Sequence, residues 1–248
     1  MSMIRTATLF CAIAAPALAG FTTIDFSTED DFFTPLVNGQ EINNPGEFGI
    51  LVTFEGVDGD RLAIFDTDPA GPNAGGEDTD LLVGLGNALI VQDSGELTQT
   101  TADIFDTPDD EVGGGILMNL VTAGQVASVD LIDINSGART IITLTDQNGF
   151  QRVYDVPANW TNEAPAVAGF DTLSFLTVDD QEGEGSAGPA TVTLNELGYD
   201  QNAVASIEFD IRGSGAIDNI TIGALVPSPG SAVRFGAAGL VLVRRRRA

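Results

Sequence analysis

The chain has 248 residues, of which 43% are hydrophobic, enough to build one large all-β domain or two small ones around a sizeable core. Ten arginines oppose 36 acidic residues, and six of the ten lie in the two terminal segments, which leaves four arginines and a charge of −32 in the body between them. Such a body repels nucleic acid and anionic lipid and attracts cations. The same charge also suits a soluble surface in salty surroundings.

The sequence has no His and no Lys, and its one Cys, Cys11, lies near the N-terminus. These absences exclude zinc and copper sites built on imidazole or thiolate, Ser-His-Asp and Cys-His nucleophiles, a lysine Schiff base and a P-loop. Because no disulfide can form within the domain, its stability has to come from the hydrophobic core, with bound ions as a further source.

Residues 1–19 have the pattern of a secretory signal peptide. One positive charge at Arg5 precedes an apolar run, and Ala17 and Ala19 supply the small residues at positions −3 and −1 of a cleavage site. A buried N-terminal strand or helix is the alternative, but the apolar run stops at Gly20 and a strand-like pattern follows at once. We therefore expect an exported protein.

Many short segments rich in β-branched and aromatic residues alternate with turns rich in Gly, Asn and Asp. The pattern predicts an all-β fold, an antiparallel β-sandwich or jelly roll, in one domain over residues 20–224. The clearest hairpin spans residues 140–156, with Asn148 and Gly149 in its turn. The predicted strands cover residues 21–26, 49–54, 61–65, 88–92, 116–121, 127–134, 140–145, 150–156, 173–178, 190–194, 204–211 and 216–222.

A Gly-, Pro- and Asp-rich loop between residues 61 and 92 concentrates negative charge, with only Arg61 nearby. Its five acids are Asp66, Asp68, Glu77, Asp78 and Asp80. A hard divalent cation would neutralise these carboxylates. Calcium accepts oxygen ligands from a flexible loop and does not require them at a rigid spacing. We predict that Ca²⁺ binds here, although Asp side chains that cap turns explain some of these acids equally well. A short echo links residues 63–69 (AIFDTDP) with residues 103–109 (DIFDTPD).

Asp218 is a second metal candidate, because it lies between Ile217 and Ile220 in the last predicted strand. A carboxylate there is costly unless it is paired or bound to a metal. In jelly-roll binding modules an acid of the last strand commonly meets one of the first strand on a structural calcium, and Asp25 is the candidate here. The alternative is that Asp218 faces solvent on the other side of the strand.

Trp160 is the best single candidate for contact with a sugar, because aromatic faces bind sugars and Trp160 lies in a loop-like stretch. The alternative is a residue at the rim that covers the core. Two carboxylates at a fixed separation would also make a glycoside hydrolase, but no pair among the 36 acids is marked as buried and protonated. We therefore assign no catalytic residues.

The C-terminal segment has three unlike parts. A Pro-x-Pro motif is followed by an apolar run over residues 235–243 and then by a cluster of arginines. This order resembles the PEP-CTERM sorting signal of bacterial exported proteins, with Ser228 where the family name has Glu. The resemblance implies recognition and cleavage by an exosortase, a membrane protease-transpeptidase, and a link with extracellular polysaccharide. Its signal residues are Pro227, Ser228, Pro229, Arg244, Arg245, Arg246 and Arg247.

The body also resembles an uncharacterised domain that recurs in such exported proteins. The matching pieces are residues 23–26 with 38–39, residues 64–66, 78–81 and 86–90, and residues 213–220. The resemblance implies a jelly roll akin to carbohydrate-binding modules and carries no known activity. We expect an exported, calcium-stabilised structural or adhesive protein of the cell envelope or extracellular matrix, held transiently at the membrane by residues 225–248. A carbohydrate-binding module is the alternative, and a glycoside hydrolase the third possibility.

Overall fold

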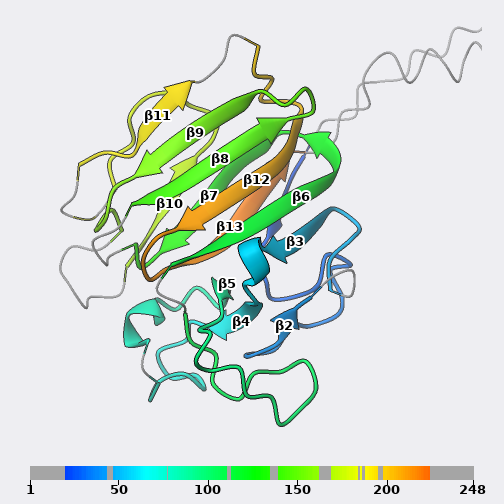
Figure 1. Ribbon diagram of the computed structural model, residues 1–248, viewed down its shortest axis with the longest axis vertical. Helices are drawn as coiled ribbons and strands as arrows, with labels where there is room; N and C mark the ends of the chain where they lie inside the picture. The colour runs from blue at the N-terminus through cyan, green and yellow to red at the C-terminus, as the bar shows by residue number, and fades with distance from the viewer. Residues whose placement is uncertain are drawn as a thin grey trace, which may run out of the picture.

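The protein was analysed as a computed structural model that describes residues 20–43, 47–76, 78–110, 113–134, 139–161, 169–183, 185, 188–194 and 198–223. Two antiparallel sheets pack face to face (Figure 1). The six-stranded sheet contains, in spatial order, β11 (Thr191–Leu194), β9 (Gln151–Val156), β8 (Thr140–Asp146), β12 (Val204–Ile211), β6 (Gly114–Gly124) and β3 (Val52–Gly56). The seven-stranded sheet contains β10 (Phe170–Ser174), β7 (Val126–Ile132), β13 (Ala216–Gly223), β5 (Asn87–Val91), β4 (Leu62–Asp66) and β2 (Glu41–Ile42), with β1 (Phe21–Ile24) beside β13.

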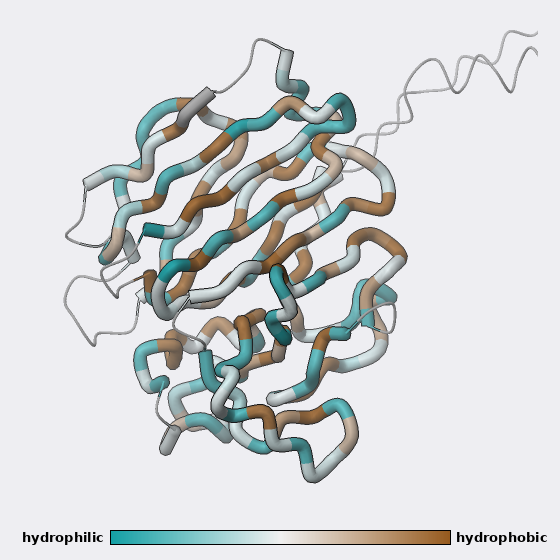
Figure 2. Tube along the Cα trace, in the orientation of Figure 1, coloured by the Kyte–Doolittle hydropathy of each residue, from teal (hydrophilic) through white to brown (hydrophobic). Residues whose placement is uncertain are grey.

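The main core lies between the two sheets. Strands that face it on one side alternate between buried and partly exposed residues, as in β8 and β9. In Figure 2 apolar and polar residues accordingly alternate along these strands. Phe26, Phe48 and Phe54 form one aromatic cluster in this core, and Tyr154 packs edge to face on Phe175. The predicted all-β antiparallel sandwich is confirmed.

Strands β4 and β5 are buried on both faces. Leu62, Ile64 and Leu89 point into the main core, while the alternate residues join a second cluster on the outer side of the seven-stranded sheet. That cluster contains Ala63, Phe65, Leu81, Ala88, Ile90, Phe105, Ile132 and Ala216. The two loops that follow β4 and β5 supply Leu81 and Phe105 and cover this face; we call them the loop cap.

The first and last strands of the domain lie side by side. Phe21 is the register partner of Gly223, and Ile24 that of Ile220. One edge of β13 therefore pairs with β5 at residues 216–217 and with β1 at residues 220–223. The described residues at the two ends of the chain consequently meet at one end of the sandwich.

Most predicted strands are present, and where a strand begins or ends at another residue than predicted, the cause is local. β3 begins at Val52 and not at residue 49, because one carboxylate oxygen of Asp30 accepts the amides of residues 49, 50 and 51 at 2.7–3.0 Å. β10 begins at Phe170 and ends at Ser174, after which the Phe175 and Thr177 carbonyls accept the Tyr154 hydroxyl. The two-residue strand β2 was not predicted. In the 140–156 hairpin Gly149 has a φ of 86°, as the turn requires.

Candidate functional site

Three carboxylates meet where the two loops of the loop cap touch. Asp78 lies just before the 3₁₀ turn η2 (Thr79–Leu81), and Asp109 and Asp110 end the second loop. One oxygen of each carboxylate lies within 4.8 Å of one oxygen of each of the other two. Within the described part of the chain, this acid triad is the one such group of three.

Backbone hydrogen bonds hold the acid triad in place. The Asp110 amide donates to Oδ2 of Asp78 at 2.7 Å, and the Gly215 amide donates to Oδ2 of Asp110 at 2.5 Å. The second bond links the triad to the turn before β13. The triad is thus attached to the sheet and to both loops, so its geometry depends on the whole loop cap.

The acid triad is poorly solvated, and no arginine of the described residues forms an ion pair with it. Burial raises the pKa of Asp78 to about 6, that of Asp109 to about 7 and that of Asp110 to about 6. The charge of Asp110 adds to the shift of Asp78, that of Asp78 to the shift of Asp109, and that of Asp133 to the shift of Asp110. Ion pairs between described residues join Arg61 to Glu41, Arg139 to Asp155 and Arg212 to Asp210, and none includes a triad acid. Ionising all three carboxyls is therefore costly, and either protons or a bound cation relieve that cost.

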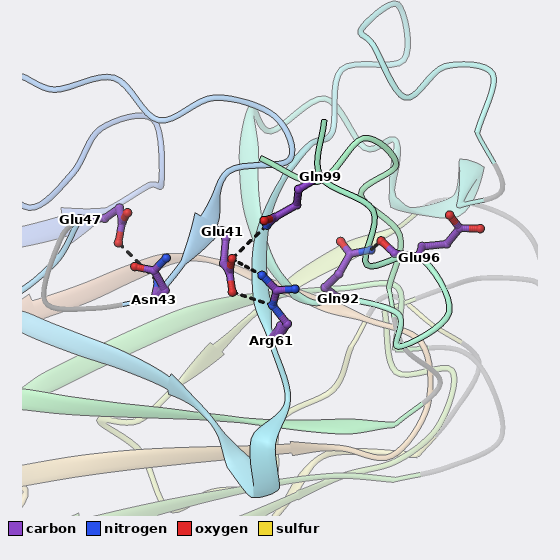
Figure 3. Close-up of polar contacts among 7 residues, drawn as sticks. All are labelled: Glu41, Asn43, Glu47, Arg61, Gln92, Glu96 and Gln99. Carbon is purple, nitrogen blue, oxygen red and sulfur yellow. Dashed lines mark hydrogen bonds and ion pairs between the residues drawn. The ribbon is translucent and has the colours of Figure 1, made fainter. Parts of the chain in front are cut away.

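Arg61, the one cation near the acidic loop in the sequence, is already engaged (Figure 3). Its guanidinium makes a two-pronged contact with Glu41, which also accepts from Gln99 at 3.0 Å. The guanidinium also lies 4.6 Å from the centre of the Phe105 ring. Arg61 thus attaches the second loop to the sheet and leaves the triad without a countercharge.

A cavity of about 160 Å³ adjoins the acid triad. Oxygen-bearing side chains around it could complete a coordination shell with Asp78 and Asp109. They belong to Asn38, Asn73, Asp106 and Thr107. Calcium prefers six to eight oxygen ligands. Oδ1 of Asn38 already accepts the Asp66 amide and the Asn73 side chain, each at 2.9 Å, whereas Oδ1 of Asn73 accepts, among the described residues, only Asn38 and keeps acceptor capacity for an ion.

The other predicted acids of the first loop have different surroundings. Oδ1 of Asp66 accepts the Asp68 amide, and Oδ1 of Asp68 accepts the Ala70 amide, each at 2.9 Å. Both residues therefore cap turns, the alternative that the sequence left open. Asp80 lies in η2, and none of the three belongs to the acid triad. Glu77 lies outside the described residues.

Asp218 is buried, and its register partner on β7 is another buried acid, Asp130. Burial raises the pKa of Asp218 to about 8, and the charges of Asp130 and Asp25 add to the shift. Asn219 has a φ of 48° and donates Nδ2 to both members of this buried acid pair, at 2.9 Å to Asp130 and 3.2 Å to Asp218. The solvent-facing alternative for Asp218 is wrong. Asp25 is near enough for its charge to act on Asp218, and its Oδ1 accepts the Ser27 hydroxyl at 2.7 Å.

Trp160 offers no ring face to a ligand, because only 1% of its surface is exposed. Its Nε1 donates to the Gln181 carbonyl at 3.1 Å. Gly183 approaches so closely that a Cβ there would lie 2.8 Å from the indole. The sequence-based suggestion of a sugar contact at Trp160 is therefore wrong in this structure, and the residue covers the core, as in the stated alternative.

Among the described residues, no loop covers the outer face of the six-stranded sheet as the loop cap covers that of the other sheet, and we call it the bare face (Figure 1). Register places five polar residues side by side across five strands of this bare face. This polar row is Thr53, Asn119, Ser206, Thr145 and Gln151. The next row contains Glu55, Leu117, Glu208, Thr143 and Val153, and the third contains Gly115, Asp210, Ile141, Asp155 and Thr191. None of these outward positions is aromatic.

Sequence reasoning missed Asp109, Asp110, Asp130 and the whole bare face. The echo of residues 63–69 in residues 103–109 was the available signal for the second loop, since Phe65 and Phe105 both enter the second cluster. The sorting-signal residues, from Pro227 to Arg247, lie outside the described residues. Among the residues that are described, no helix has the length and apolar character to cross a membrane.

Neither protein-family models nor curated proteins match this sequence. Among solved structures, the fold is similar to that of a family 11 carbohydrate-binding module from Clostridium thermocellum, in complex with a β-1,3-1,4-mixed-linked tetrasaccharide. The identity is 14%, the TM-score is 0.32, and the match covers 76% of this chain and 98% of the module. A score this low carries no argument about ligand or residues.

Proposed function

We propose that the protein is an exported, calcium-stabilised β-sandwich with a structural or adhesive role in the cell envelope or extracellular matrix. The acid triad is the observation that carries the calcium part of this proposal. Asp78, Asp109 and Asp110 bring three oxygens within 4.8 Å beside an oxygen-lined cavity, with no ion pair to neutralise them. A bound Ca²⁺ would neutralise the triad and join the two loops of the cap.

Titration calorimetry on EDTA-stripped protein tests the calcium assignment. We expect Ca²⁺ to bind and Asp109→Asn to abolish the binding, while Asp68→Asn, which alters an acid that caps a turn, leaves it unchanged. Mg²⁺ is expected to bind more weakly, because it holds its water and requires octahedral geometry. Equal heats for both variants would remove the triad from the proposal.

A non-catalytic role suits the same carboxylates. Oxygens of all three acids are grouped together, whereas a glycosidase places its two carboxyl groups on either side of the glycosidic bond. Asp110 is also buried, with 8% of its surface exposed. The triad is therefore better suited to hold an ion than to flank a glycosidic bond.

The resemblance of residues 225–248 to an exosortase signal supports the sorting part of the proposal. We infer that these residues hold the protein transiently at the membrane and direct its processing. Expression with and without residues 227–248 in a host that has the sorting machinery tests this inference. Identical release of both forms, with identical processing, would contradict it.

Carbohydrate binding is the second candidate function, and the bare face favours it. A broad, uncovered sheet face with hydroxyl and amide side chains can hold a polar polymer without enclosing it. This role is compatible with an adhesive protein in a polysaccharide matrix. A glycan array with and without calcium would separate it from a purely structural role.

A further inference from the structure

The bare face carries two of the four arginines of the body, and they lie close together. Arg212 follows β12, and Arg139 precedes β8, immediately beyond the register pair Ile211 and Thr140. Like charges at adjoining strand ends repel each other. Here each is neutralised by an acid of the third row: Arg212 bonds Asp210 through Nε at 2.8 Å, and Arg139 bonds Asp155.

These two Arg–Asp pairs present donors and acceptors side by side. The side chains of Arg139 and Arg212 are 64% and 54% exposed, so part of each guanidinium fork faces solvent. The side chains of the acids Asp155 and Asp210 are 26% and 41% exposed, so carboxylate surface lies beside each fork, while Oδ1 of Asp155 is itself buried. A ligand group that both donates and accepts hydrogen bonds would match each pair, and a hydroxyl is such a group.

A groove of about 440 Å³ lies at the same end of the face. Arg212, Asp210 and Glu208 line one side, and the 3₁₀ turn η1 (Val57–Gly59) lines the other. Gly115 allows this close approach, since a Cβ there would lie 2.6 Å from Val57. The Gly115 amide donates to Asp60 at 2.8 Å and holds the turn in place.

The polar row extends the same chemistry across the sheet. Its Thr and Ser hydroxyls and its Asn and Gln amides each donate and accept. Neighbouring strands lie about 4.8 Å apart, so five strands give a row roughly 19 Å long. Leu117, Val153 and Ile141 lie between the polar groups and supply aliphatic surface for the C–H faces of sugars.

Charge decides which polymer fits. The body carries 36 acids against four arginines, and both arginines of the bare face are already paired with acids. An anionic chain would be repelled at most approaches. A neutral chain avoids this repulsion and still meets donors and acceptors in alternation.

We propose that the bare face binds a neutral polysaccharide. The Arg212–Asp210 pair would contact its hydroxyls at the groove, the Arg139–Asp155 pair would contact them on the neighbouring strands, and the polar row would follow the chain. The proposal rests on the carbohydrate-binding candidate above and assigns it a site and a ligand class. It is independent of calcium at the acid triad.

Affinity gel electrophoresis of the full chain provides the test, in native gels with a mixed-linkage β-glucan, a xylan, a galactomannan, alginate or polygalacturonate. We expect retardation by at least one of the three neutral polymers. The double variant Arg212→Gln/Asp210→Asn, which leaves the net charge unchanged, and Asn119→Ala should each weaken that binding about tenfold. Asp179→Asn, in an exposed loop off the bare face, should bind as the parent does.

Retardation by no neutral polymer, or by the acidic ones alone, would overturn the proposal. So would neutral-polymer binding that both bare-face variants retain in full, provided that their thermal melts match the parent. Repeating the gels in EDTA separates the two proposals. Sugar binding that persists without calcium supports this inference even if the acid triad binds no ion.

Discussion

The outer faces of the two sheets differ, because one is covered by loops and the other is exposed. On the seven-stranded sheet the loop cap covers β4 and β5, whose sequences LAIF and ALIV are apolar on both sides. On the six-stranded sheet, β8 and β12 alternate between buried and partly exposed residues, and their outer side stays bare. A continuous apolar run therefore indicates a strand that is buried on both faces, and alternation indicates a strand that is buried on one face. The covered face holds the acid triad, whereas the bare face holds hydroxyls, amides and Arg–Asp pairs.

The largest effect is expected where the loop cap meets the sheet. Phe65 is buried in the second cluster, and Phe65→Ala should lower the free energy of unfolding by about 3–5 kcal/mol, through lost burial and the cavity that remains. Urea unfolding monitored by the intrinsic fluorescence of Trp160 would measure it. A loss below about 1 kcal/mol would mean that the cap contributes little packing energy.

Calcium should also stabilise the covered face. Binding only to the native state adds about 2.7 kcal/mol when the free ion is a hundredfold above its dissociation constant. Thermal melts in EDTA, Ca²⁺ and Mg²⁺ should show the largest increase in melting temperature with Ca²⁺. Constant ionic strength is essential, because simple screening would stabilise so acidic a body without any site.

Asp110→Asn and Asp66→Asn form the matched pair for these melts. The first alters a triad acid, and the second alters a carboxylate that accepts the Asp68 amide. Only the first should lose the response to calcium. If Asp66→Asn loses it equally, then the ion sits in the first loop and not at the triad.

The sandwich could be read from the sequence because local signals agreed with the fold. Residues 204–211 form β12 with the predicted bounds, and Asn148-Gly149 forms the predicted turn. The acid triad could not be predicted, because Asp78 and Asp109 are 31 positions apart and their loops meet only after Leu81 and Phe105 have packed on the sheet. Trp160 was misassigned since its sequence neighbours look like a loop, while Gly183, far along the chain, closes over its ring.

Asp218 lies on β13 of the seven-stranded sheet, buried next to Asp130 of β7. Asp218→Ala should cost about 2 kcal/mol at pH 6, since the Asn219 amide loses a buried acceptor at 2.6 Å. Asp179→Ala, an exposed loop residue, is the control. Equal urea midpoints for the two variants would show that the buried acceptor contributes nothing.

Stability in EDTA should fall as pH rises. A carboxyl whose pKa is higher in the folded than in the unfolded state keeps its proton longer in the folded state. Its contribution to the free energy of unfolding is therefore complete below about pH 3.9, the unfolded pKa, and is lost as pH rises to the folded pKa. Asp78, Asp109 and Asp110 place this decrease between about pH 4 and pH 7, and Asp218 extends it to about pH 8. Each group contributes at most about 1.4 kcal/mol per pH unit. Urea titrations at several pH values would measure the slope, and saturating Ca²⁺ should flatten the part due to the triad.

The smallest effect is expected on the bare face, and neighbouring positions on β8 measure it within one strand. Ile142 points into the main core, so Ile142→Ala should cost about 2–5 kcal/mol, whereas Thr143 points outward and Thr143→Ala should change stability by less than about 0.5 kcal/mol. Because both residues share the same backbone ladder with β9 and β12, the difference isolates the faces from the strand itself. If Thr143→Ala instead costs more than about 1 kcal/mol, the outer face is part of the folded core and is not free to hold a ligand. A small value leaves its hydroxyls and amides, unneeded for folding, available for binding.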